Sequence, residues 1–575
     1  MAAQPPDMIA PAGAASWSRP NRWDVAAALI VLGLIAVLGL EVREFARPLP
    51  PPEARAIDLD PAALPYYALR TVARMLAAMV LSLAFSFAYA PLAARNRRAE
   101  QILIPVLDIL QSVPVLGYIA LVVAMVAELL PGSALGYELA AVFALFTSQA
   151  WNMTFSLYQS LKTVPADLLE AARAFGLSRR QRFWRLDVPF AMPGLVWNAM
   201  MSMSGGWFFI VASEAITVSG EAVSLPGIGS YIARALAEQR ADAVAWAVGA
   251  MFAVILLYDQ LLLRPLVAWS DRFKAESEPG VARPRSWVLA VLQRTRLLPA
   301  LAQLAYRAIE PWIAAPRARR DDGRAGLTGA IERMIVPVSA TGALLGVLAI
   351  GYLAFVGLGR GELVRVLGYA AATAARVLTL TALAAVIWTP VGILVGMRPA
   401  LARFVQPVAQ FLAAFPANVL FPIFVVAVLR WGLDPDVWLS PLIVLGTQWY
   451  ILFNVIAGAA AFPAELVLAA RGLRVGGLVW WQRVALPGVF PFLVTGLITA
   501  SGGAWNASVV AEAVSWGDER LSAAGLGSYI AAATEAGDYL RIALGVIVMA
   551  AFVSLLNRVL WRPLYALAER RYRLA

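Results

Sequence analysis

Apolar stretches of about 20 residues recur along this chain, and they constrain its fold more than any other feature. A helix of about 20 apolar residues matches the thickness of the hydrocarbon core of a bilayer, where every backbone polar group must be paired within its own element. Of the 575 residues, 61% are hydrophobic and only 14% are charged. In soluble proteins about a quarter of all residues are charged. The sequence therefore predicts an all-α integral membrane protein.

Twelve of these stretches are expected to be transmembrane helices, six in each half of the chain. The first set covers residues 25–43, 68–92, 103–127, 136–158, 192–216 and 243–265. The second set covers residues 335–358, 370–394, 404–428, 437–460, 490–514 and 541–562. The first stretch is too long for the apolar part of a signal peptide, so we expect it to be a span.

Most of the 47 lysines and arginines fall in alternate loops, on the side of the membrane that holds both termini. Cytoplasmic loops carry an excess of basic residues, so this bias predicts that both termini are cytoplasmic. The net charge of +11 has the same explanation. We therefore expect the chain to contact membrane lipid and no nucleic acid.

The two halves of the chain repeat each other. Three residues of the first half, Arg74, Pro105 and Pro114, recur at one constant spacing as Arg376, Pro407 and Pro416. Four more recur at a second constant spacing: Pro165, Pro189, Pro193 and Glu214 match Pro463, Pro487, Pro491 and Glu512. Because each copy has six spans, both copies have the same orientation. The expected fold is two parallel six-helix repeats about an axis normal to the membrane, with a pathway between them.

The expected domains are a first half at 1–269, a cytoplasmic linker at 270–333 and a second half at 334–575. Residues 286–313 of the linker are apolar, but two arginines fall in their middle. We therefore interpret them as an amphipathic helix on the membrane surface rather than as a thirteenth span. Its side chains toward lipid or protein would be Trp287, Leu298, Leu301 and Trp312.

The longest loop inside the first half, residues 162–193, has helical signals of its own. Pro165 suits a first helical turn, and Gly176 can end that helix in a left-handed conformation. Ser178 then begins a capping box that opens a second, basic helix, which Pro189 is expected to close. We expect two short helices in a cytoplasmic loop.

Within this loop, Glu170, Ala171 and Ala172 are followed at fixed spacing by Gly176 and Pro189. This pattern resembles the EAA loop of the permeases of ATP-binding-cassette (ABC) importers, in the binding-protein-dependent family with the type I fold. The resemblance implies a coupling helix that seats in a cleft of a separate ATPase subunit. Two adjacent alanines offer a smooth face for close docking, and the glutamate offers a charge. The alternative is a solvated amphipathic helix without a partner.

The matching loop of the second half, residues 461–491, departs from this pattern. The positions that match it are Ala469, Ala470 and Pro487. Leu468 stands in place of the glutamate and Arg474 in place of the glycine. Glu465 lies one helical turn earlier, on roughly the same face, and is the candidate replacement for the missing acid.

Ionisable residues also occur at the ends of the spans, where their burial is costly and often marks function. The candidates for the substrate pathway are Arg74, Arg376, Glu214 and Glu512, with Ser204 and Ser501 on the fifth spans. The charged residues either bind the charge of a substrate or pair with one another within the bundle. Each serine precedes two glycines, which would let the fifth spans approach closely.

Threonine three residues before each arginine, and a Gly-x-Gly-Ser-Tyr loop after each glutamate, resemble the nitrate, sulfonate, taurine and bicarbonate branch of the importer permeases. The resemblance implies that a small oxyanion or small organic anion is the substrate. It also implies a periplasmic or extracellular solute-binding protein and a place in the bacterial inner membrane.

The sequence contains no cysteine and no histidine, which removes the commonest nucleophiles, general bases and zinc ligands. It also lacks a Gly-x-x-x-x-Gly-Lys-Ser/Thr phosphate-binding loop, and its only lysines are Lys162 and Lys274. We therefore expect no enzyme activity and no cofactor in this chain, with ATP and magnesium bound by two copies of an ABC ATPase. The alternative is a secondary transporter with two parallel six-helix halves, which would need no ATP.

Overall fold

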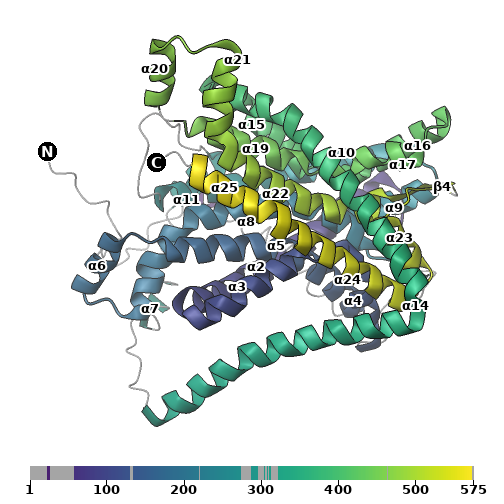
Figure 1. Cartoon of the computed structure of the whole chain (residues 1–575), viewed down its shortest axis with the longest axis horizontal. Coiled ribbons are helices and arrows are strands. Elements are labelled where there is room, and N and C mark those ends of the chain that lie inside the picture. The colour runs from purple at the N-terminus through teal and green to yellow at the C-terminus, as the bar shows by residue number, and fades with distance from the viewer. Residues whose placement is uncertain are drawn as a thin grey trace. The chain divides into compact units, whose positions relative to one another are not determined.

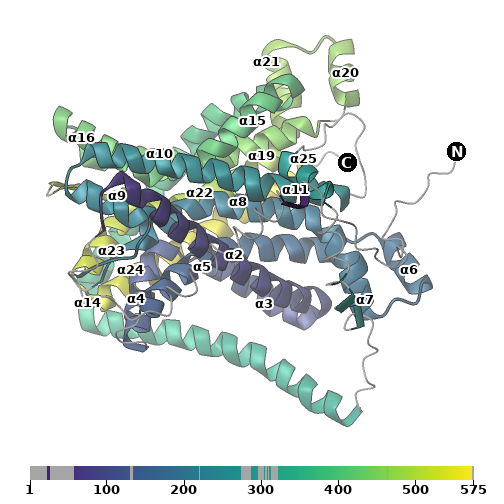
Figure 2. The same cartoon turned by 180° about the vertical axis from the view of Figure 1, so that it is seen from behind.

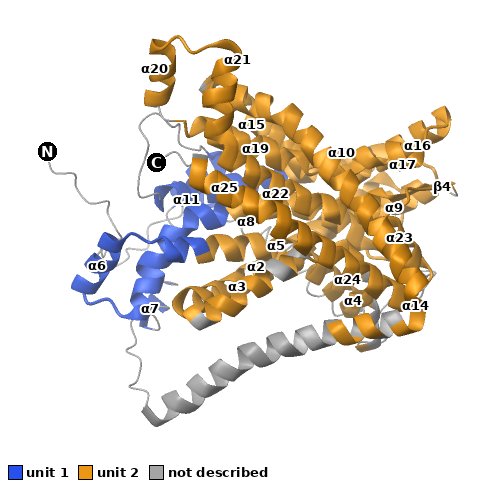
Figure 3. Ribbon diagram, viewed as in Figure 1, with its two compact units in different colours: residues 1–42, 159–197, 257–326 blue, residues 43–158, 198–256, 327–575 orange. Residues whose placement is uncertain are grey.

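Helices make up most of the chain in the computed structural model (Figure 1). The residues that the structure describes are 23–25, 57–129, 134–218, 221–273, 286–295, 304, 307–308, 310–311, 322–462, 464–517 and 519–572. The predicted span at 25–43 lies almost wholly outside them, as do Leu298, Leu301, Trp312 and Pro463. Two compact units are distinguished (Figure 3): residues 1–42, 159–197 and 257–326 form unit 1, and the remaining residues form unit 2.

The first half of the chain has its elements in the following order. They are η2 (Pro61–Ala63), α2 (Leu64–Arg95), α3 (Arg97–Ser112), α4 (Val115–Leu129), α5 (Ala134–Lys162), α6 (Ala166–Ala174), α7 (Arg179–Arg182), η3 (Phe183–Asp187), α8 (Val188–Glu214), β1 (Ala215–Val218), β2 (Glu221–Ser224), α9 (Ile228–Ala237), α10 (Ala241–Tyr258), η4 (Asp259–Leu263), α11 (Arg264–Ser270), η5 (Asp271–Phe273) and α12 (Trp287–Gln293). Seen from behind, α2 and α9 lie side by side (Figure 2), and the rings of Tyr67 and Tyr231 join them at 6.1 Å.

The second half repeats this order. Its elements are α14 (Asp322–Gly396), α15 (Pro399–Ala414), η6 (Ala417–Leu420), α16 (Phe421–Trp431), α17 (Pro435–Trp438), α18 (Ser440–Leu445), α19 (Gln448–Ala460), α20 (Ala464–Gly472), α21 (Gly477–Trp480), η7 (Trp481–Ala485), α22 (Leu486–Ala511), β3 (Ala513–Trp516), β4 (Glu519–Ser522), α23 (Leu526–Glu535), α24 (Tyr539–Leu556), η8 (Asn557–Trp561) and α25 (Arg562–Tyr572). The strands of each half form one short antiparallel hairpin, β1 with β2 and β3 with β4.

Six helical segments of the described chain are long and apolar enough to cross a membrane, and two bent pairs raise the number to as many as eight. The six are Pro61–Arg95, Arg179–Glu214, Ala241–Phe273, Val356–Gly396, Gly477–Ala511 and Tyr539–Arg571. This confirms the prediction of an all-α membrane protein. The number of twelve spans stays a prediction.

Three predicted spans are broken helices rather than continuous ones. The predicted span 103–127 is split between Ser112 and Val115, and the predicted span 404–428 is split by a bend of 75° after Ala414. Pro114 and Pro416 lie at these two breaks, because proline lacks an N–H and disfavours a helical residue before it. The predicted span 437–460 is bent by 43° between α18 and α19.

The prediction that Pro189 closes a helix is wrong. The chain continues from α7 through the π-helical turn η3 directly into α8, so Pro189 lies in the first turn of a longer helix. A proline is tolerated there, because the wider π turn loosens the hydrogen-bond ladder just before it. Pro487 lies in the same position after η7.

Side chains from both halves of the chain form one core cluster within unit 2. Leu116 from the first half contributes to it, together with Trp505 and Ile530 from the second. Polar contacts join the halves at the two proline breaks. The backbone N–H of Val115 donates to Asn506 Oδ1 at 2.7 Å, and Asn418 Nδ2 donates to the carbonyl of Phe208 at 3.3 Å.

Glycines allow α14 and α19 to approach closely. A Cβ atom on Gly392 would lie 2.7 Å from Val455 Cγ1, and one on Gly396 would lie 2.6 Å from the carbonyl oxygen of Ile456. Gly368, on the same helix, has open space where its Cβ would lie. Small residues spaced four apart commonly let membrane helices pack backbone to backbone.

Gly396→Ala is expected to lower the free energy of unfolding by about 1–3 kcal/mol, because the added methyl group must push α14 away from α19. Gly368→Ala is the matched control and should change stability little or raise it, since alanine favours a helix. Thermal unfolding in detergent measures both. Equal losses in the two variants would contradict this packing.

Candidate functional site

The loop helix of the first half forms as the sequence predicts. Pro165 stands at the N-cap of α6, and Gly176 takes the left-handed conformation just after it, with φ +64°. Ser178 and Gln181 close the predicted capping box at the start of α7. The two short helices α6 and α7 are therefore joined by one tight turn.

The two faces of α6 differ in exposure. Ala172 is buried within unit 1, whereas Glu170 and Ala171 are exposed. Phe175, at the end of the helix, is 82% exposed. The helix and its C-terminal end thus expose a carboxylate, a small alanine and a large apolar side chain, which are groups that can dock against a partner.

The loop helix of the second half, α20, has the same backbone but a more apolar exposed face. Glu465 and Ala469 are exposed and Ala470 is buried. Leu468 and Leu473 are 64% and 77% exposed, where the first loop has Glu170 and Phe175.

Arg474 adopts the left-handed conformation that Gly176 adopts in the first half, with φ +53°. This backbone conformation costs a residue with a side chain about 1–2 kcal/mol. The hydrogen bonds that end the helix are nevertheless the same in both loops: the N–H of Val475 donates to Ala470, and that of Leu177 to Ala172. The turn is therefore required in both halves, although the second half has no glycine for it.

Two predicted pathway residues of the first half, Arg74 and Glu214, meet in one buried ion-pair cluster at the C-terminal end of α8. We call this cluster the first hub: Arg70, Thr71, Arg74, Glu138 and Glu214. Arg74 binds Glu138 through two nitrogens at 2.5 and 2.7 Å, and it donates to Glu214 Oε1 at 2.7 Å. Arg70 donates to Glu138 at 2.8 Å. Two arginines thus balance two glutamates.

Glu214 also holds the Gly-x-Gly-Ser-Tyr loop in place. The N–H of Gly229 donates to its second oxygen at 2.7 Å, and a Cβ atom on Gly227 would lie 2.3 Å from the carboxylate. Thr71 donates to Glu214 at 2.7 Å and accepts the N–H of Ile228 at 3.1 Å. The glycines are required because the backbone passes directly over the carboxylate.

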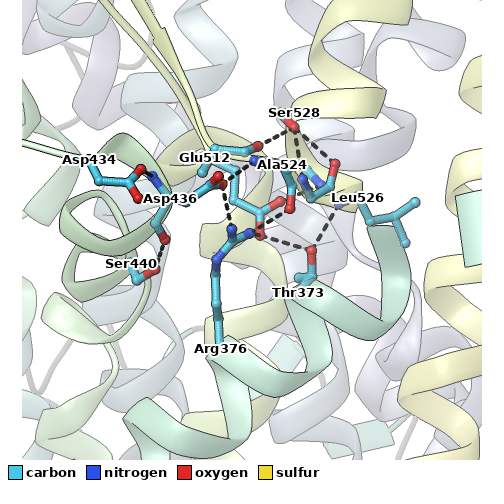
Figure 4. Close-up of polar contacts among 12 residues, drawn as sticks. Thr373, Arg376, Asp434, Asp436, Ser440, Glu512, Ala524, Leu526 and Ser528 are labelled. Atoms are coloured by element: carbon cyan, nitrogen blue, oxygen red, sulfur yellow. Dashed lines mark hydrogen bonds and ion pairs between the residues drawn. The ribbon is translucent and has the colours of Figure 1, made fainter. Parts of the chain in front are cut away.

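The second hub repeats this arrangement at the end of α22 and comprises Thr373, Arg376, Asp436 and Glu512 (Figure 4). Arg376 donates to Glu512 at 3.1 Å and to the carbonyl of Ala524 at 3.0 Å. Its other terminal nitrogen donates to Asp436 Oδ1 at 2.8 Å. The N–H of Gly527 donates to Glu512 Oε2 at 2.7 Å, as Gly229 does to Glu214.

Arg74 and Arg376 each pair with the glutamate on the fifth predicted span of their own half. Of the two alternatives for these charged residues, substrate binding or mutual pairing, the structure shows the pairing. Glu138 and Asp436 are the hub acids that the sequence reasoning missed. Glu138 and Asp436 are separated by the same number of residues as Glu214 and Glu512, so the repeat could have identified them as a matching pair of acids.

The two predicted serines lie away from the hubs. Ser204 is partly exposed on α8 and donates to the carbonyl of Met200 at 3.1 Å. Ser501 is buried within α22. Their place in a pathway stays a prediction.

Comparison with known proteins gives two matches to the family described as "Binding-protein-dependent transport system inner membrane component", at residues 81–264 and 388–574. Together these matches cover more than half of the chain. They fall one in each half, which confirms the internal repeat.

Several curated relatives are permease proteins. The bicarbonate transport system permease protein CmpB of Synechococcus elongatus is 32% identical over 180 residues, which are 31% of this chain and 62% of the relative. The nitrate import permease protein NrtB of Leptolyngbya laminosa is 28% identical over 175 residues, 30% of this chain and 59% of the relative. The glycine betaine/proline betaine permease protein ProW of Escherichia coli is 29% identical over 163 residues, 28% of this chain and 44% of the relative. The match thus spans less than two thirds of each relative.

The two family matches, the repeated hubs and the paired loop helices agree with one another. The chain belongs to the family of binding-protein-dependent transport system inner membrane components, as a multi-pass permease with two repeats of the family domain.

Proposed function

We propose that this chain is the translocation subunit of an ABC importer and moves a small oxyanion or small organic anion into the cytoplasm by alternating access. The observation that carries the proposal is the pair of exposed loop helices, α6 and α20, each followed by a π turn and a long apolar helix. The names of the bicarbonate and nitrate relatives favour an anion.

The energy for transport would come from two copies of a separate ABC ATPase, one at each loop helix. ATP and magnesium would be bound by those copies, and this chain would hold no cofactor. A solute-binding protein would deliver the substrate from the periplasmic or extracellular side. The chain would lie in the bacterial inner membrane with both termini in the cytoplasm.

In this proposal the first hub has a structural role and does not bind substrate. Arg74 is fully buried and its donors are directed to two glutamates and one carbonyl. An arginine committed in this way has little left to offer a passing anion. We therefore assign Arg74 and Glu214 to holding the end of α8, rather than to binding substrate.

Purified chain without partners is expected to hydrolyse no ATP, because its sequence has no phosphate-binding loop. With the ABC ATPase present in the membrane, uptake should require ATP. Phosphate release and uptake into proteoliposomes are the measurements. ATP-independent uptake driven by an ion gradient would instead favour the secondary transporter.

Glu170→Ala is expected to weaken capture of the ATPase several-fold, because Glu170 is the exposed acid in the complete loop pattern. Glu465→Ala is the matched change in the second loop and should have a smaller effect, since leucines dominate that face. Pull-down of the ATPase by each variant from detergent extracts is the test. Equal losses would mean that Glu465 replaces the missing glutamate.

Arg74→Gln is expected to lower stability by about 3–5 kcal/mol, because it leaves buried glutamates without their partner. Arg376→Gln should cost less, about 1–3 kcal/mol, because it leaves only one buried acid, Glu512, without its arginine, whereas its other partner Asp436 is 51% exposed. Thermal unfolding in detergent compares the two directly. Normal stability with loss of uptake in Arg74→Gln would contradict the structural role of the first hub and would indicate that Arg74 binds substrate.

A further inference from the structure

The second hub differs from the first at one acidic position. Glu138 is buried and lies between two arginines, Arg70 and Arg74. Its counterpart Asp436 is 51% exposed, has Arg376 as its one ion-pair partner among the described residues and projects from the four-residue helix α17. Half-exposed ion pairs contribute little to stability, whereas buried ones are held firmly by the surrounding protein.

The carboxylate of Asp436 accepts from two hydrogen-bond donors that could also bind a small oxyanion. Its Oδ1 accepts from Arg376 Nη2 at 2.8 Å and from the backbone N–H of Ala524 at 2.6 Å (Figure 4). A guanidinium next to a backbone N–H is a common way for proteins to bind carboxylates and related oxyanions. The carboxylate of Asp436 therefore sits where one oxygen of a small oxyanion would sit.

The side chain of Asp436 can leave these donors without unfolding its helix. The N–H of Asp436 is held separately by Asp434 Oδ1 at 2.9 Å, and Ser440 donates to the carbonyl of Asp436 at 2.9 Å. Both bonds hold the backbone and neither involves the carboxylate. A turn about the side-chain bonds of Asp436 would expose both donors to solvent.

The remaining contacts of Arg376 keep it in place when Asp436 turns away. Its Nη1 stays bound to Glu512 and to the carbonyl of Ala524, and only Nη2 is released. The side chain of Arg376 is 15% exposed, so an ion can reach it from solvent. The matching side chain of Arg74 is fully buried, with 0% exposed.

We propose that Arg376 Nη2 and the N–H of Ala524 form a binding site for a small planar oxyanion, such as nitrate or bicarbonate, which Asp436 occupies in the absence of the anion. The anion takes the place of a carboxylate that is itself planar and singly charged. The site lies at the end of α22 opposite the loop helix α20, so an anion would reach it on the side away from the ATPase. The choice of anion class rests on the proposed function.

The test is anion binding to the purified chain without ATPase or ATP, measured by isothermal titration calorimetry. Asp436→Asn removes the competing charge but keeps an oxygen that can accept from Ala524, so the fold is retained. We expect nitrate and bicarbonate to bind this variant at least tenfold more tightly than the native chain. Arg376→Gln in the Asp436→Asn background should abolish binding.

Glu519→Gln is the matched control, because it removes one negative charge from an exposed position of the same half. It should leave anion affinity within about twofold of the native value, since screening by salt weakens charges that are not in contact. Sulfate, which is tetrahedral, should bind Asp436→Asn more weakly than nitrate does.

Three results would overturn the proposal: equal affinities in Asp436→Asn and the native chain, equal tightening by Glu519→Gln, or sulfate binding as tight as that of nitrate. Because binding is measured without ATP, these results stand apart from the proposed function. That function fails on its own if the assembled transporter shows no ATP-dependent uptake.

Discussion

A buried carboxylate at the end of the fifth predicted span of each half is the constraint around which this end of the protein is arranged. An isolated charged carboxylate is costly in apolar surroundings, and both Glu214 and Glu512 are almost fully buried. Each carboxylate is satisfied from three directions, by an arginine, a threonine and a glycine N–H. These partners come from segments far apart in the sequence. The hairpin and the short helix that follow must therefore return to one point.

The two halves share this backbone more closely than they share side chains. Left-handed turns occur at matching places, with a glycine in one half and a larger residue in the other: Gly176 matches Arg474, and Gln239 matches Gly537. Gln239 uses its side chain, which donates to the carbonyl of Trp516 at 3.3 Å. The two copies thus keep the same path by different means. Differences such as Asp436 against Glu138 arise within an unchanged scaffold.

Much of the fold could be read from the sequence, because apolar length and constant spacing are strong signals. The loop helix, its capping box and the left-handed Gly176 were predicted residue by residue, since each depends on local chemistry. The breaks at Pro114 and Pro416 were missed, although both prolines were noted as part of the repeat. The path through Pro189 was misjudged because a π turn has no distinct sequence pattern. Glu138 and Asp436 were missed because pairing across a bundle depends on tertiary approach.

The continuous path from α21 through η7 into α22 has a mechanical consequence. The 26 residues of α22 form one continuous rod, with α20 and α21 before its first residue and Glu512 just beyond its last. At 1.5 Å per residue the rod is about 39 Å long, so a tilt of about 5° at the π turn displaces its far end by about 3 Å. That displacement is comparable to the length of a hydrogen bond. A small movement of α21 about the π turn is therefore enough to open or close a polar contact at the far end of α22.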